Sequence, residues 1–86
     1  MKNFNINNNT KERVEVMALF GYEMTPCEPL SFKRSRDEEA EEVTELLESQ
    51  VRFSGNFARH IFDVMVGKRR CKLEFDAKTL YWYLVA

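Results

Sequence analysis

Alternating apolar and polar positions mark an extended segment near the start of the chain. Every even position in residues 14–24 is apolar, and this period of two sends the apolar side chains to one face of a strand. Upstream, Phe4 and Ile6 alternate with asparagines, and the asparagines of residues 7–9 tolerate the left-handed conformations that turns need. The pattern therefore predicts an N-terminal hairpin.

The same alternation returns at the end of the chain. Cys71, Leu73 and Phe75 alternate with charged residues, and residues 76–79 have the composition of a turn. Residues 80–85 are continuously apolar or aromatic, which is typical of a strand that is covered on both faces. These features predict a C-terminal hairpin.

The middle of the chain follows a helical period instead. Pro26 and Pro29 lack backbone donors, so residues 25–34 are predicted to form a loop. Ser35 followed by Glu38 has the spacing of a capping box, which marks the start of a helix. The apolar residues downstream fall on one helical stripe. They are Ala40, Val43, Leu46, Leu47 and Val51.

A second helix is predicted to begin at Ser54. Phe57, Ile61 and Val64 repeat at helical spacing, Met65 follows on the same stripe, and the glycine at position 67 is a natural left-handed terminator. The helical stripe of this segment is apolar, so it is expected to pack against the sheet.

The order hairpin, helix, helix, hairpin indicates an α+β fold. We expect a small antiparallel sheet, made of the N-terminal hairpin and the C-terminal hairpin, packed with two central helices. Residues 1–86 are expected to form a single domain, because a chain of this length supports one core. The alternative places a helix at residues 12–24, with Asn9 as its cap, and gives the outline of a winged helix-turn-helix.

Charge is distributed unevenly along the chain. The formal net charge is −1, which gives no overall attraction to nucleic acid or to an acidic membrane. Residues 25–50 carry three basic and eight acidic side chains, a balance of −5, whereas residues 51–86 carry seven basic and three acidic side chains, a balance of +4. Any functional electrostatics therefore has to come from a local surface.

The acidic side chains of the first predicted helix form the leading candidate for a binding surface. Spaced at helical intervals opposite the apolar stripe, they create an acidic helix face that suits a basic protein groove. The simpler interpretation is an ordinary solvated face. The residues of this candidate partner-binding face are Glu38, Glu41, Glu42, Glu45 and Glu48.

A basic group in the C-terminal part is the alternative binding surface. Cationic side chains followed by the aromatic run 81–83 have the composition of a nucleic-acid interface, in which cations contact phosphates and rings stack on bases. The alternative nucleic-acid-binding residues are Arg59, Lys68, Arg69, Arg70 and Lys72. In the winged-helix alternative Arg59 lies on the helix that reads the DNA and the others lie on the wing.

Catalytic and cofactor motifs are not recognisable in the sequence. His60 and Asp63 are one helical turn apart in the predicted helix, but no further group completes an acid–base site. Two cysteines and one histidine are too few for a typical zinc site, so no metal and no cofactor is expected, and the two thiols are expected to be reduced.

The sequence therefore predicts a small non-enzymatic binding protein that is soluble, intracellular and cytoplasmic. Its expected partner is a protein, in particular a nucleic-acid-handling protein that the acidic helix would block, as small viral or mobile-element inhibitors do. Direct binding of DNA or RNA is the alternative function. No membrane contact is expected, and a homodimer joined through an edge strand is a further alternative.

Overall fold

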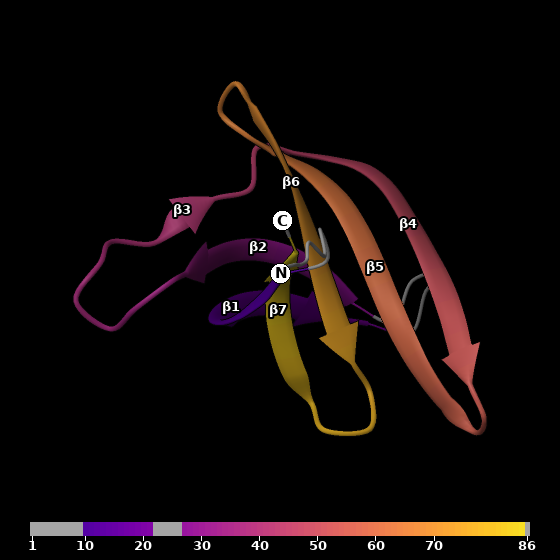
Figure 1. Cartoon of the computed structure of the whole chain (residues 1–86). Helices are drawn as coiled ribbons and strands as arrows, with labels where there is room; N and C mark the ends of the chain where they lie inside the picture. Colours follow the sequence, from indigo (N-terminus) through magenta and orange to yellow (C-terminus); the bar gives the residue numbers. More distant parts are fainter. Residues whose placement is uncertain (1–9, 22–26, 86) are drawn as a thin grey trace, which may run out of the picture.

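The chain folds into a single antiparallel sheet of seven strands. The structure is a computed structural model that describes residues 10–21 and 27–85. The strands lie in the order β3-β2-β1-β7-β6-β5-β4 and curl into a half-barrel (Figure 1). Their bounds are β1 Lys11–Phe20, β2 Cys27–Lys33, β3 Glu41–Glu42, β4 Glu45–Ser54, β5 Phe57–Val66, β6 Arg69–Asp76 and β7 Tyr81–Val85.

The α+β prediction and its winged-helix alternative are both wrong. The described residues contain no helix: the first segment predicted to be helical forms a loop, β3 and most of β4, and the second forms β5. Glutamate and leucine favour helix in residues 38–51, but intrinsic propensity is weak beside the pairing of strands in a sheet. The serine, valine and phenylalanine at positions 49, 51 and 53 point to one face, and the three polar residues between and before them point to the other.

The long strand predicted from residue 14 onward is present as β1. The sequence suggested the segment around Phe4 and Ile6 as its partner, whereas the structure shows two other strands beside it. β1 pairs with β2 on one side and with β7 on the other. Residues 27–33, predicted as loop, form β2, and Pro29 lies next to a register shift in the pairing with β1, where a proline is tolerated. The predicted N-terminal hairpin strand around Phe4 and Ile6 lies outside the described residues.

The C-terminal hairpin is present as predicted. β7 pairs along its whole length with residues 72–76 of β6, with Phe75 opposite Trp82. Two-residue turns join β4 to β5 and β5 to β6, and each begins with a glycine at positive φ, Gly55 at 65° and Gly67 at 62°. A glycine at the first turn position is what type II′ hairpins require. Gly67 therefore turns a hairpin rather than ending a helix.

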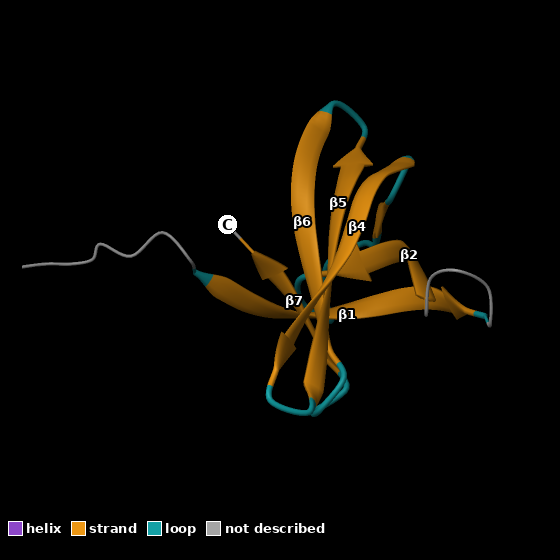
Figure 2. Cartoon of the chain, turned by 90° about the vertical axis from the view of Figure 1, so that its right-hand side faces the viewer, coloured by secondary structure: helices purple, strands orange, loops and turns teal. Residues whose placement is uncertain are grey.

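The core lies on the concave face of the curled sheet. Aromatic rings from three adjacent strands stack there, with the Trp82 ring 4.9 Å from Phe75 and 5.7 Å from Phe62 between centroids. Leu73 and Val64 are fully buried beside them. In both views β1 and β2 cross the long strands β4, β5 and β6 steeply, so the two halves of the sheet cover each other's apolar side chains (Figure 2).

Two residues between β3 and β4 join the ends of the curled sheet. The amide of Val43 donates to the carbonyl of Leu30 in β2 at 2.9 Å. The next amide, that of Thr44, donates to the carbonyl of Met65 in β5 at 2.8 Å, and the Thr44 hydroxyl donates to the same oxygen at 3.1 Å. The chain therefore links the β2 side of the sheet directly to the β5 side.

Leu80 gives a stability test of the turn between β6 and β7. Its φ is 66°, a left-handed value that costs a leucine about 1 kcal/mol or more, and its side chain is 69% exposed. We expect Leu80→Gly to raise the free energy of unfolding by about 0.5–1 kcal/mol in urea titrations. The control Leu47→Gly, at an exposed strand position without positive φ, should lower it. A loss of stability in Leu80→Gly would show that packing of the side chain outweighs the backbone strain.

Candidate functional site

The second half of β1 and its partner β2 form a ribbon that presents apolar side chains to solvent. β1 pairs with β7 only as far as Val14, and from residue 15 onward it pairs with β2 alone. Met17 and Leu19 are more than 60% exposed on one face of this ribbon, and Leu30 of β2 is exposed as well. Phe20 lies on the other face, where it is 60% exposed although its ring edge contacts Phe75. Exposed apolar residues on two neighbouring strands are typical of a contact surface.

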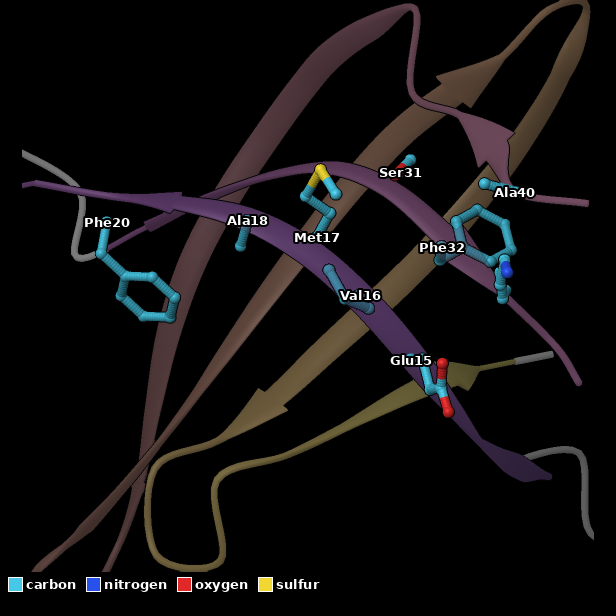
Figure 3. A pocket seen from close by; sticks show the side chains of 9 residues that line it. Glu15, Val16, Met17, Ala18, Phe20, Ser31, Phe32 and Ala40 are labelled. Carbon is cyan, nitrogen blue, oxygen red and sulfur yellow. The ribbon is translucent and has the colours of Figure 1, made fainter. Parts of the chain in front are cut away.

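A pocket of about 560 Å³ lies on this ribbon (Figure 3). β1 contributes residues 15–18 and Phe20, β2 contributes residues 31–33, and Ala40 comes from the chain just before β3. The lining is mainly apolar, while Glu15 and Lys33 lie opposite each other across the two strands. A mainly apolar pocket with a few charged groups at its margin is the usual form of a binding site.

The loop that carries Ala40 is held at both ends by ion pairs. Arg34, at its start, donates to both carboxylate oxygens of Glu12 in β1, at 2.7 and 3.2 Å. This hydrogen-bonded guanidinium holds the pKa of Glu12 below its usual value. At the other end, Glu41 in β3 pairs with Arg69, the first residue of β6. These contacts fix the loop beside the pocket.

The predicted acidic helix face does not exist as a helix face. The five glutamates are divided among the loop, β3 and β4: Glu38 is in the loop, Glu41 and Glu42 form β3, and Glu45 and Glu48 are in β4. Glu41 is partly covered by its pairing with Arg69, and the other four are exposed. Their role in binding a partner stays a prediction, now for an acidic loop and strand edge.

The predicted basic group is partly neutralised by carboxylates. Lys68 and Lys72 are exposed, but each of the three arginines faces an acidic partner. Arg59 lies 3.7 Å from Glu74, Arg70 lies 3.6 Å from Asp63, and Arg69 pairs with Glu41. The aromatic run that would stack on bases is also occupied, since Trp82 is in the core and the Arg13 guanidinium lies 3.4 Å from the Tyr81 ring centroid.

Glu74 is the one charged residue that is buried among the described residues, and nothing in the sequence singled it out. It lies on the convex face, where Lys11 donates to its carboxylate at 2.8 Å and Arg59 approaches from the other side. A buried charge needs such partners because its desolvation is costly. Lys11 and Glu74 come from opposite ends of the chain, so only the pairing of β1 with β7 brings them together.

His60 and Asp63 do not form an acid–base pair. Three residues apart on a strand, they point to opposite faces of the sheet. His60 stacks on Phe75, with 6.2 Å between ring centroids, and Asp63 pairs with Arg70 on the other face. Sequence reasoning missed this because the helical spacing of these two residues would have placed them on one side.

The residues of the pocket were also missed as a group. The sequence marks Met17 and Leu19 as apolar on the second face of β1, which suggests cover on both sides, yet the structure leaves both exposed. Ala40 appeared as a core position of the predicted helix. The available signal was the presence of two apolar residues, Met17 and Leu19, on the otherwise polar face of an alternating strand. Such a pair is typical of a surface that binds a partner as well as of a buried core.

Cysteine reactivity tests the burial of β2. Cys27 and Cys71 are free thiols, and burial raises the pKa of Cys27 to about 11. At pH 8 iodoacetamide should therefore modify Cys71 first and reach Cys27 only as the protein unfolds. Mass spectrometry measures the modification of each cysteine over time. Between about pH 9 and 11 the Cys27 thiol keeps its proton in the folded protein and loses it in the unfolded chain, so the free energy of unfolding should fall across this range. Equal alkylation rates in the folded protein would contradict the buried position of Cys27.

Comparisons with known proteins add no relatives to this description. The sequence matches no family model and no curated protein, and the fold matches no solved structure. Within residues 10–21 and 27–85 there is no group of three or more side chains arranged to hold a metal ion. The same residues contain no helix long and apolar enough to cross a membrane.

Proposed function

We propose that this protein is a small non-enzymatic binding module that takes up an apolar side chain of a protein partner in the β1–β2 pocket. The observation that carries the proposal is the pocket of about 560 Å³ on a ribbon whose apolar side chains are exposed. Burial of one large side chain in such a pocket is worth roughly 1.5–3 kcal/mol, which makes it a suitable anchor for a peptide segment.

The charge beside the pocket supports a basic partner segment. Asp37, Glu38 and Glu39 are exposed in the loop that leads to Ala40 and outnumber Arg36 of the same loop, while in the pocket lining Glu15 is balanced by Lys33 opposite it. The nearby Arg34 is already paired with Glu12. Complementary charge around an apolar anchor increases the rate of association and its specificity.

Direct nucleic-acid binding is the weaker candidate. The arginines of the basic group are held by carboxylates, and the faces of two tyrosine rings carry the protein's own cations, since Lys11 also lies over Tyr83. A nucleic acid would have to displace these partners before it could contact the side chains. The net charge of −1 adds no long-range attraction.

Selection from a random peptide library tests the proposed function. Peptides enriched on the wild-type protein should share one aromatic or large aliphatic residue flanked by lysine or arginine. Ala40→Trp fills the pocket from an exposed position, so it should weaken these peptides about tenfold or more in fluorescence anisotropy. The matched control Ala77→Trp, at an exposed alanine in the turn between β6 and β7, should leave the affinity unchanged.

Charge variants complete the test. Replacing Glu38 and Glu39 by glutamine should weaken the selected peptides and flatten the dependence of affinity on salt, because the replaced carboxylates no longer attract the basic flanks. No enrichment on the wild type, or equal binding of the peptides to Ala40→Trp, would refute the pocket as the site. A fluorescent single-stranded oligonucleotide that binds more tightly than the peptides would favour the nucleic-acid alternative.

A further inference from the structure

β4 is a long edge strand with its free side open to solvent. In the described part of the chain it has a neighbour on one side only, β5, and Figure 1 shows it at the margin of the sheet. Val51 is exposed, and Phe53 is 74% exposed. The free N–H and C=O groups of such an edge can pair with another strand, which proteins normally prevent by short or charged edges.

The charges of β4 are unfavourably placed within the chain's own sheet. Glu48 lies opposite Asp63 of β5, and Arg52 lies opposite Arg59. Like charges directly opposite each other on neighbouring strands are destabilising. Both charges of β5 turn to partners on β6, since Asp63 pairs with Arg70 and Arg59 with the carboxylate of β6 described above. Within the described residues, Glu48 and Arg52 have no partner of opposite charge.

A second copy of β4 supplies the missing partners. In an antiparallel pair with Gln50 opposite Gln50 of the second copy, Glu48 of each chain lies opposite Arg52 of the other. Moving the register by one step of the same parity instead places Glu48 opposite Gln50 or Ser54, so the ion pairs select one register. Each row across the joined sheet then places the two carboxylates of one copy, Asp63 and Glu48, next to the two guanidinium groups of the other, Arg52 and Arg59, so opposite charges meet at the interface.

The apolar side chains agree with this register. Val51 lies opposite Ser49 of the second copy and diagonal to the second Val51. Phe53 comes to the start of the second β4, where Leu47, the extra residue of the register shift, is also exposed. Because a twofold axis perpendicular to the sheet keeps the same face on the same side, the concave faces of the two copies join. Side chains that are exposed in one copy therefore cover each other in the pair.

We propose that the protein forms a twofold-symmetric dimer through antiparallel pairing of β4, with Glu48 of each chain bound to Arg52 of the other. The dimer interface at β4 does not include the β1–β2 pocket, because β4 and the β1–β2 ribbon lie towards opposite ends of the strand order. The dimer therefore carries two pockets, and its formation does not depend on what they bind.

A charge-reversal cycle measured by sedimentation equilibrium tests the dimer. Glu48→Arg and Arg52→Glu each replace two ion pairs by two like-charge contacts, and each should raise the dissociation constant about 10- to 30-fold. The double variant E48R/R52E restores opposite charges and should return to within about threefold of the wild type. The matched control Glu45→Arg lies outside the paired register and should leave the dissociation constant unchanged.

The single variants also separate dissociation from unfolding. Glu48→Arg places a cation opposite Asp63, and Arg52→Glu places a carboxylate opposite Arg59, so each isolated chain should melt at the wild-type temperature or above it in dilute solution. A wild type that is monomeric at all concentrations would overturn the dimer, and so would a double variant that stays as weak as the single ones. Peptide binding at the pocket is measured in a separate experiment, so failure of the dimer would not contradict the proposed function.

Discussion

A single sheet with one apolar face and no second layer has to cover that face by itself. The described residues contain no helix, so the concave side is closed by the curl of the sheet, in which β1 and β2 turn across the long strands. The stacked rings of Phe62, Trp82 and Phe75 fill the curl, and the hydrogen bonds of Val43 and Thr44 join its two sides. The pocket and the open β4 edge both follow from this geometry, because a curled sheet leaves a rim and two edges exposed.

The sequence allowed prediction of the strands whose local pattern agreed with their final environment. β1 and β6 alternate with period two, and β7 is a continuous apolar run after clear turn residues, so these strands could be recognised without tertiary information. β4 could not, because its glutamate-rich and leucine-rich sequence has helical propensity and only the pairing with β5 overrides it. A register shift next to Leu47 also breaks the alternation at the point where it would have been visible. The pocket depends on β1 pairing with β2, a segment predicted as loop, and no local pattern encodes that choice.

The uneven charge of the chain has a structural explanation. The acidic middle and the basic C-terminal part meet in the fold, where the pair of Glu41 with Arg69 joins β3 to the start of β6. The sequence suggested a separate acidic face, whereas the structure shows partial internal neutralisation, with the remaining carboxylates in the loop before β3 and along β4. Two local surfaces remain, an acidic margin beside the pocket and a strand edge that carries both signs. Neither would be evident from a net charge of −1.

The pairing of β1 with β7 also sets the order in which the fold can form. Strands β4 to β7 are consecutive hairpins, whose close contacts form quickly, whereas Lys11 lies opposite Val85. During synthesis β1 therefore waits until β7 has left the ribosome before it gains its second neighbour. In that interval the β1–β2 ribbon stands with its apolar side chains uncovered, a state in which a growing chain is open to chaperones and to misassembly. Among the described strands, the pairing of β1 with β7 is thus the last that becomes possible during synthesis.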